Sequence, residues 1–416
     1  MKRIHTLAAA LMVASVAGYA TTHYVGGDIS LLPDYEKAGA TYRDHSGKKI
    51  ANLIPWLREE GMNAMRVRLF VDPDAYKGSD KDPNACQDLE YITPLCKRIV
   101  ESGLDLMLDF HYSDTWADPA KQWTPEAWKD LSDEELYQKI YDYTKETLTT
   151  LKSEGIVPKF IQPGNEISYG MLWGPYGTPD NEQKKALMGS DRNWDRFGKL
   201  LSQAIKACRE VCPDAGIVIH TERVSNVPVQ TNFYNKMKQL GIDYDIIGLS
   251  YYPYFHGSMD VLSRALDSLE KQFPEKEIMI VETGYSYKWE VPGTDHDNTA
   301  TWPYSEAGQD KFARDLVATL EAHHNVDGLF WWWMEYNAYN TTLSGWYNAP
   351  LFDSTTGKAT QALKTICGFA EDSGVDDVHA DTENGKDVWY TIHGIRVDHP
   401  STPGLYIRNH RKYILK

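Results

Sequence analysis

Eight short apolar segments, separated by helical stretches, are the feature of this 416-residue chain that most limits how it can fold. The segments are residues 24–30, 64–70, 104–111, 160–166, 216–221, 245–252, 278–284 and 328–333. Several are almost uninterrupted apolar runs, such as DLMLDF, DIIGLS and EIMIVE. Such runs are typical of parallel strands that are buried on both faces.

Amphipathic stretches lie between these segments, at residues 89–102, 133–153, 194–209, 259–272 and 305–323, with a last helix expected around residues 359–368. Regular alternation of strands and helices predicts a parallel sheet. Eight such units within residues 21–370 predict an α/β protein with a single (β/α)₈ TIM barrel. No GxGxxG motif follows the first segment, which argues against a dinucleotide-binding sheet.

The two ends of the chain are expected to lie outside the barrel. Lys2 and Arg3 precede an apolar run over residues 7–16 and then small residues, so residues 1–20 are predicted to be a secretory signal peptide. The run is too short for a membrane anchor, which needs about 20 apolar residues. The protein is therefore expected to be exported, to the periplasm, the cell surface or the medium. Residues 371–386 are predicted to be a linker, and residues 387–416 a short β-rich carboxy-terminal tail.

The net charge of the chain indicates which kinds of ligand it can bind. The chain has 59 acidic and 43 Lys and Arg residues, a formal net charge of −16. An acidic chain without a basic stripe argues against nucleic acid and favours a neutral ligand. No other segment is long and apolar enough to be a transmembrane span, and the sequence leaves the oligomeric state open.

The five cysteines leave at least one thiol unpaired within an exported chain. Cys86 and Cys96 are a candidate disulfide across a short loop. Cys208 and Cys212 lie one helical turn apart, a spacing that suits a metal or two buried thiols better than a relaxed disulfide. Because no further His or Cys pair lies nearby to complete a zinc site, inert thiols are favoured.

Two glutamates are the strongest catalytic candidates. In a barrel of this type the active site lies at the carboxyl ends of the strands. Glu166 ends the fourth segment, directly after Asn165, and Glu282 ends the seventh. A salt bridge or a helix N-cap would explain either glutamate alone. Two carboxylates facing each other across a cleft can hydrolyse a glycosidic bond, and the pair therefore predicts catalysis.

Other polar residues end neighbouring strands. Asp109 and His111 point to the same side of the third strand. A metal would need further His ligands, of which His220 is the one similar candidate, so hydrogen bonding to a substrate hydroxyl or to a glutamate is favoured. Arg66 and Arg68 need buried partners. Arg68, nearer the carboxyl end, is predicted to pair with a carboxylate and keep it ionised, with a structural ion pair as the alternative.

Most of the 13 tryptophans are expected near the carboxyl ends of the strands. They are Trp116, Trp123, Trp128, Trp173, Trp289, Trp302, Trp331–Trp333 and Trp346. Amphipathic rings on one face of a barrel suit the stacking of sugars. Ordinary loop packing would explain about half of them individually.

Six segments together resemble glycoside hydrolase family 53, the arabinogalactan endo-β-1,4-galactanases of the clan with catalytic glutamates on strands 4 and 7. These segments are GGDIS (26–30), GMNAMRVRLFVDP (61–73), DLMLDFHYSDTWADPAKQW (105–123), IQPGNEI (161–167), GLSYYPYFHG (248–257) and VETGYSY (281–287). The resemblance extends from about residue 24 to residue 369. It implies a secreted hydrolase that acts on β-1,4-galactan, with no cofactor needed for the chemistry.

The resemblance also implies residue roles. Glu166 would be the general acid/base and Glu282 the nucleophile of a retaining double displacement, with carboxyl groups about 5–5.5 Å apart. Glu166 must begin protonated and Glu282 ionised, which Arg68 would favour. The implied substrate contacts are Arg68, His111, Asp114, Trp116, Asn165, Tyr252, Trp332 and Trp333, with Asn165 placed to bond the sugar 2-hydroxyl.

Two departures from the family pattern leave points open. Strand 8 ends in Trp331-Trp332-Trp333-Met334-Glu335 rather than a Trp-Glu-Pro-type segment, so the tryptophan that stacks on the sugar is not settled. Some bacterial members hold calcium after strand 7. Asp295, His296 and Asn298 are a candidate structural calcium loop here, although Pro292 and Thr294 replace expected acids and calcium prefers six to eight oxygen ligands.

Two other functions remain as alternatives. One is the same chemistry on another β-glycan, such as glucan or mannan. The other is a non-catalytic glycan-binding protein that kept the aromatic cleft, against which the presence of both glutamates argues.

Overall fold

The computed structural model describes residues 23–341 and 349–370, together with the strand segments 389–391, 396–397, 404–408 and 411–415. The chain divides into two compact units, Met1–Glu371 and Asp372–Lys416. The predicted signal peptide (1–20) and linker (371–386) lie outside the described residues.

The first unit is a closed parallel barrel of eight strands. Its strands are β1 (Tyr24–Gly27), β2 (Ala64–Leu69), β3 (Asp105–Phe110), β4 (Phe160–Pro163), β5 (Gly216–Thr221), β6 (Ile246–Tyr251), β7 (Glu277–Thr283) and β8 (Val326–Trp331). The strand order is β1-β8-β7-β6-β5-β4-β3-β2. A parallel bridge between Asp28 and Arg66 joins the end of β1 to β2 and closes the ring. The predicted (β/α)₈ barrel is confirmed.

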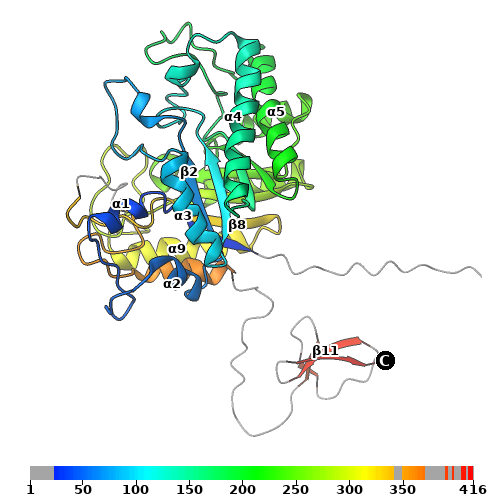
Figure 1. Ribbon diagram of the computed structural model, residues 1–416. Helices are drawn as coiled ribbons and strands as arrows, with labels where there is room; N and C mark the ends of the chain where they lie inside the picture. Colours follow the sequence, from blue (N-terminus) through cyan, green and yellow to red (C-terminus); the bar gives the residue numbers. More distant parts are fainter. Residues whose placement is uncertain are drawn as a thin grey trace, which may run out of the picture. The chain divides into compact units, whose positions relative to one another are not determined.

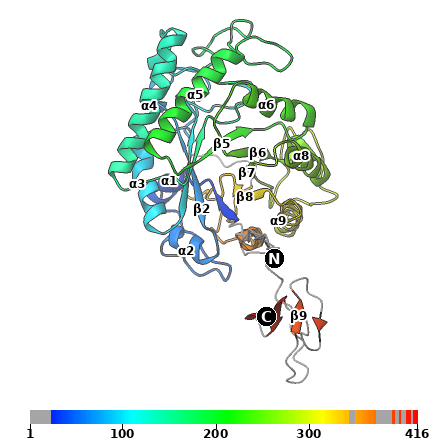
Figure 2. The same ribbon diagram turned by 90° about the vertical axis from the view of Figure 1, so that its right-hand side faces the viewer.

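Helices surround the strands, as Figures 1 and 2 show. They are α1 (Leu32–Lys37), α2 (Leu53–Glu59), α3 (Leu89–Glu101), α4 (Asp133–Ser153), α5 (Trp194–Val211), α6 (Val227–Gln239), α7 (Pro253–His256), α8 (Met259–Gln272), α9 (Glu306–Glu321) and α10 (Gln361–Cys367). The sequence did not predict α6, whose β-branched and polar residues have low helix propensity. Its start is set by Pro228 in the first turn and by Asn226, whose side chain accepts the N–H of Val229 at 3.3 Å.

The barrel interior changes from apolar to polar along the strands. A buried apolar cluster fills the lower part and consists of Ala64, Met107, Phe160, Val218, Ile246, Met279, Val281 and Phe330. Because alternate residues of a strand share a face, inward positions further along β2 to β6 hold polar side chains, with Gly248 between Ile246 and Ser250 on β6. These are Arg66, Asp109, Gln162, His220 and Ser250, all fully buried. The chain thus builds a polar layer directly above an apolar one, toward the carboxyl ends of the strands.

The predicted disulfide between Cys86 and Cys96 is wrong. Cys86 and Cys96 are both free thiols. Cys96 points into the core from the inner face of α3, whereas the sulfur of Cys86 lies 3.5 Å from a carboxylate oxygen of Asp34. The two sulfurs therefore point to different parts of the structure and do not form a disulfide.

The second unit contains a small antiparallel sheet of four strands in the order β10-β9-β11-β12. They are β9 (Trp389–Thr391), β10 (Arg396–Val397), β11 (Gly404–Arg408) and β12 (Arg411–Leu415). The sequence predicted a short β-rich tail over residues 387–416, and these four strands lie within it.

None of the helices in the described part of the chain has the length and apolar character that crossing a membrane requires.

Closure of the barrel requires a glycine at position 26. A Cβ atom there would lie 1.8 Å from the backbone oxygen of Ala64, so neither strand could keep its place. We expect Gly26→Ala to lower the free energy of unfolding by about 1–3 kcal/mol, as overpacking does. Gly368→Ala is the matched control, because nothing lies within 4 Å of its Cβ position. Urea unfolding measures both, and equal stability of the two variants would contradict this account of closure.

Candidate active site

Arg66 lies at the centre of the polar layer. Its guanidinium is fully buried and contacts three carboxylates: Asp109 at 2.8 Å, Glu282 at 2.9 Å and Asp28 at 3.7 Å. Burial opposes the positive charge, but Asp109, Glu282 and Asp28 together raise the pKa of Arg66 above its ordinary value. The arginine therefore remains a fixed cation that links β2 to β3, β7 and the end of β1.

Glu282 faces this cation from the carboxyl end of β7. Its side chain is 6% exposed, and its other oxygen accepts a hydrogen bond from the hydroxyl of Tyr252 at 3.2 Å. Burial raises the pKa of Glu282 to about 7, while Arg66 acts in the opposite direction. The partner predicted from the sequence was Arg68, and that pairing is wrong: Arg68 is one inward position further along β2, where it bonds Asp28 at 2.7 Å.

Glu166 lies on a tight turn just after β4. Its backbone has a positive φ of 46°, and that of Gly164 is 111°. A non-glycine residue in this conformation costs of order 1–3 kcal/mol and is typical of functional sites. The side chain is partly exposed, and Oε1 accepts a hydrogen bond from the Ser250 hydroxyl at 2.6 Å. Burial, followed by the negative charges of Glu282 and Glu222, raises the pKa of Glu166 well above its ordinary value.

Both glutamates are held by β6 and the residue that follows it. Ser250 bonds Glu166 and Tyr252 bonds Glu282. Ser250 and Tyr252 are two residues apart in extended backbone, so their side chains point to the same side. The two carboxyl groups are therefore brought to the same space above the polar layer, where each influences the charge of the other.

Asn165 is locked in one orientation beside Glu166. Its amide oxygen accepts from Arg66 at 2.9 Å, and its amide nitrogen donates to the carbonyl of Ala117 at 2.8 Å. A side-chain amide oxygen can only accept and its nitrogen only donate. The remaining N–H of the Asn165 amide is consequently the one available for a further acceptor.

His111 and Asp114 shape the loop that follows β3. Nδ1 of His111 accepts the N–H of Ala117 at 3.0 Å, and its Nε2 lies 3.2 Å from Asp109. Asp114 accepts backbone N–H groups of Asp72 at 3.0 Å and Glu126 at 2.7 Å, and burial raises its pKa to about 6. Both side chains are buried and hold protein groups in place.

Three tryptophans cover Arg68 at the barrel mouth. The guanidinium carbon lies 4.8 Å from the ring centre of Trp116, 5.1 Å from that of Trp332 and 5.4 Å from that of Trp333. Arg68 itself has no exposed surface, so the rings lie between it and the barrel mouth. Such cation–π contacts contribute about 0.5–2 kcal/mol each. The three indoles, called the tryptophan wall below, are consequently held as one unit.

The remaining tryptophans divide between core and surface. Trp128, Trp173, Trp302 and Trp331 are at most 2% exposed and belong to the packed core, whereas Trp289 is 54% exposed. Trp331 is excluded from the site because its indole donates to the carbonyl of Ala349 within the core. Trp123 lies against Tyr176, and Trp346 lies outside the described residues.

Four site residues were missed or given no role by the sequence: Arg66 as the partner of Glu282, and His220, Glu222 and Ser250. His220 and Ser250 share the inward face of β5 and β6 with the polar layer, so strand alternation would have found them. Glu222 follows His220 by two positions and accepts from Ser168 at 2.5 Å. Its proximity to Glu166 depends on how the loops fold and has no signal in the sequence.

The predicted calcium loop is engaged in backbone contacts. The N–H groups of Asp295 and His296 donate to the carbonyl of Tyr254, and the Asn298 amide donates to the carbonyl of Pro253 at 2.8 Å. Among the described residues, the one group of three His, Cys, Asp or Glu ligands that comes together is Asp267, Glu270 and His323. The calcium site stays a prediction.

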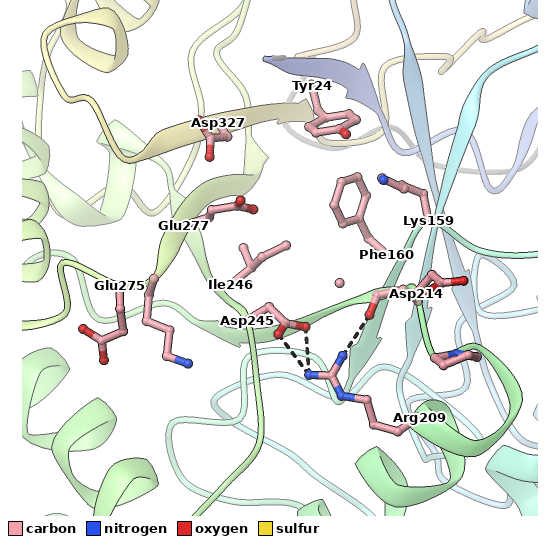
Figure 3. A pocket seen from close by; sticks show the side chains of 14 residues that line it. Tyr24, Lys159, Phe160, Arg209, Asp214, Asp245, Ile246, Glu275, Glu277 and Asp327 are labelled. Carbon is pink, nitrogen blue, oxygen red and sulfur yellow. Dashed lines mark hydrogen bonds and ion pairs between the residues drawn. The ribbon is translucent and has the colours of Figure 1, made fainter. Parts of the chain in front are cut away.

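A cavity of about 660 Å³ lies at the opposite end of the barrel (Figure 3). Residues before and at the starts of the strands line it, among them Lys159, Asp245, Glu277 and Asp327. Arg209 there is held by Asp245 at 2.9 Å. Because active sites of these barrels lie at the carboxyl ends of the strands, residues at this end serve stability.

Comparison with known proteins agrees with this geometry. The model of glycosyl hydrolase family 53 matches residues 24–366. An arabinogalactan endo-β-1,4-galactanase of Cellvibrio japonicus (strain Ueda107) is 32% identical over 395 residues, which cover 89% of this chain and 98% of that protein. The solved GH53 catalytic domain of Ignisphaera aggregans superimposes with a TM-score of 0.72 at 32% identity, covering 84% of this chain and 97% of that chain.

A solved fungal β-1,4-galactanase superimposes with a TM-score of 0.69 at 27% identity, covering 83% of this chain and 99% of that chain. The match to the family model includes all eight barrel strands together with both glutamates and Arg66. The chain therefore belongs to glycosyl hydrolase family 53, and the protein is a glycoside hydrolase.

Proposed function

We propose that this protein is a retaining endo-β-1,4-galactanase that hydrolyses β-1,4-galactosidic bonds of type I arabinogalactan. The observation that carries the proposal is that the two glutamates have different charged neighbours. Arg66 pairs with Glu282 at 2.9 Å. Among the described residues no cation pairs with Glu166, and the charge of Glu282 further disfavours a charge on it. A single shared proton therefore resides on Glu166.

This distribution assigns the first step. Ionised Glu282 attacks the anomeric carbon, and the bond between that carbon and the leaving oxygen breaks. Glu166 donates its proton to the leaving oxygen, so the departing sugar leaves as an alcohol. The hydroxyl of Tyr252 and the guanidinium of Arg66 hold the attacking carboxylate in place.

The second step follows from the change of charge. Once Glu282 is esterified to the sugar, its negative charge is gone and Glu166, now a carboxylate, takes a proton from water. The resulting hydroxide attacks the anomeric carbon, and Glu282 leaves as a carboxylate. Two inversions at one carbon retain the β configuration.

The substrate class is supported by the tryptophan wall and by the relatives. Trp332 lies near Glu282 in the fold, since its backbone N–H donates to the carbonyl of Thr283, the residue next to Glu282 in the chain, at 2.8 Å. Trp332 is the ring we assign to the reacting sugar, because it also lies 5.4 Å from Arg66. We assign the remaining N–H of Asn165 to the sugar 2-hydroxyl. The Cellvibrio japonicus relative is named an arabinogalactan endo-β-1,4-galactanase and the fungal structure a β-1,4-galactanase, and another β-glycan is the competing substrate.

Two further parts of the proposal concern regions beyond the active site. Residues 1–20 are proposed to export the protein, on the strength of their charge and apolar pattern. A structural calcium ion at Asp295, His296 and Asn298 is proposed only as an accessory to the fold, because neither chemical step uses a metal.

Replacing either glutamate tests the catalytic roles. We expect Glu166→Gln and Glu282→Gln each to lower the rate of galactan hydrolysis at least about 10²–10⁴-fold, because proton transfer or the nucleophile is lost. Galactan binding should persist in affinity electrophoresis. Glu277→Gln, at the other end of β7, is the matched control and should retain activity. A reducing-sugar assay on galactan, glucan and mannan measures the rates. Cleavage of glucan or mannan but not galactan would overturn the substrate assignment.

Arg66 should set the acidic limit of activity. Glu282 must be ionised to attack, and Arg66 lowers its pKa. Removal of the cation in Arg66→Met therefore raises the pKa of Glu282 and moves the acidic limb of the kcat/KM profile to higher pH. Arg66→Lys should move it less.

Arg68→Met is the control for this shift, because Arg68 bonds Asp28 and the tryptophan wall. Arg68→Met should leave the acidic limb of the kcat/KM profile at its wild-type pH, even if the variant protein is less stable. An identical shift in Arg66→Met and Arg68→Met, measured over the stable pH range of each protein, would show that Arg66 has no special effect on Glu282.

A further inference from the structure

Two side chains behind Glu166 form a continuous hydrogen-bonded chain that the double displacement does not by itself require. Oε1 of Glu166 lies 2.6 Å from the Ser250 hydroxyl, and Ser250 lies 2.8 Å from Nε2 of His220. Ser250 and His220 have no exposed surface. We propose that His220 and Ser250 are positioning residues that fix Oε1 of Glu166, so that Oε2 alone exchanges the catalytic proton. The inference rests on the proposed role of Glu166.

The direction of the chain follows from the donors at each atom. A serine hydroxyl has one proton to donate and lone pairs to accept. Because the Ser250 hydroxyl donates to Glu166, its oxygen must accept from His220. The proton of the imidazole then belongs on Nε2.

The surroundings of Nδ1 agree with that assignment. Two donors face it: the backbone N–H of Glu166 at 3.3 Å and the side-chain amide of Gln162 at 3.1 Å. The amide of Gln162 cannot turn, because it also donates to Asp109 at 2.6 Å. The oxygen of Asn165, 3.0 Å from Nδ1, takes its proton from Arg66 instead.

The imidazole is also held neutral. Burial, and then the charge of Arg66, lowers the pKa of His220 well below its ordinary value. A neutral ring has one proton and one lone pair. His220 therefore acts as a fixed link: its lone pair accepts from the backbone N–H of Glu166, and its proton points to Ser250, which in turn bonds the side chain of Glu166.

This chain has a consequence for the two chemical steps. A hydrogen bond from Ser250 stabilises the carboxylate of Glu166 more than the carboxylic acid. The bond therefore makes Glu166 a better proton donor in the first step. In the second step it lowers the basicity of the carboxylate, and its contribution there is to orient that carboxylate toward water. With Oε1 occupied, Oε2 donates to the leaving oxygen and later accepts from water, so the proton returns to the atom that it left.

The test uses a substrate whose first step needs no acid. A dinitrophenyl β-galactobioside has a leaving group that departs without protonation, so its kcat reports the second step and its kcat/KM the first. We expect Ser250→Ala to lower kcat about 10-fold, because the carboxylate that activates water is no longer held in its orientation, with kcat/KM nearly unchanged. Azide, which needs no base, should restore kcat and yield the β-galactosyl azide. Ser250→Thr keeps the hydroxyl and should behave as the wild type.

The pH profile supplies a second readout on galactan. Loss of the hydrogen bond should move the alkaline limb of kcat/KM to higher pH by about one unit, since one pKa unit corresponds to about 1.4 kcal/mol. His220→Gln should shift it in the same direction because Ser250 loses its orientation.

Thr221→Val is the matched control for both readouts. Thr221 is buried next to His220, but its hydroxyl bonds Tyr234 at 3.0 Å, on the outer side of β5. Thr221→Val should change neither kcat on the galactobioside nor the alkaline limb of the kcat/KM profile on galactan. Equal loss of kcat and kcat/KM in Ser250→Ala, without azide rescue and without a shift of the limb, would overturn the inference. Wild-type protein that fails to cleave galactan or the galactobioside would instead overturn the proposed function.

Discussion

The cluster of Arg66 with Asp28, Asp109 and Glu282 is the interaction on which the rest of the site depends. A buried charge is costly unless it is paired and hydrogen-bonded. Arg66 is paired with all three carboxylates and hydrogen-bonded to that of Asp109, and the four residues come from β2, β3, β7 and the end of β1. The same atoms that close the upper barrel therefore also set the charge of a reacting group. Removing one member of such a cluster costs about 3–5 kcal/mol.

The cluster also makes two chemically identical side chains different. Glu282 lies in contact with the cation, and Glu166 lies where burial and negative neighbours act on it. Burial alone would raise both pKa values. Position relative to Arg66 separates them, and this separation assigns the nucleophile and the acid. Ser250 and Tyr252 then hold the two carboxyl groups from β6 and the residue that follows it, so that charge and orientation are set by neighbouring layers of the same barrel.

Much of this architecture can be predicted from the sequence because its signals are local. Uninterrupted apolar runs mark the buried parallel strands, and the end of each run marks the barrel mouth, where Glu166 and Glu282 were found. Partners within the interior could not be predicted in the same way. Arg66 and Arg68 both point inward from β2, and which one meets Glu282 depends on the relative heights of β2 and β7 in the closed barrel. The pairing of Cys86 failed for a similar reason, since loop length indicates reach but not the direction of a side chain.

The contacts of the tryptophans likewise could not be predicted from the sequence. Their positions in the chain placed them near the barrel mouth, but their contacts differ: the indole of Trp331 bonds the carbonyl of Ala349 in the core, whereas Trp332 and Trp333 cover Arg68. Consecutive residues point to opposite sides only while the strand continues. The strand β8 ends at Trp331, and Trp333 beyond it has a positive φ of 53°. No pattern in a run of three tryptophans indicates that turn.

The central claim is that the glutamate beside Arg66 attacks the sugar. It is tested most directly by trapping the glycosyl-enzyme with a 2-deoxy-2-fluoro-galactobiosyl fluoride, followed by proteolysis and mass spectrometry of the labelled peptide. The account predicts one equivalent of label on Glu282 and no label on Glu166. Label on Glu166, or turnover of a good substrate with no covalent intermediate and inversion of the anomeric centre, would contradict it.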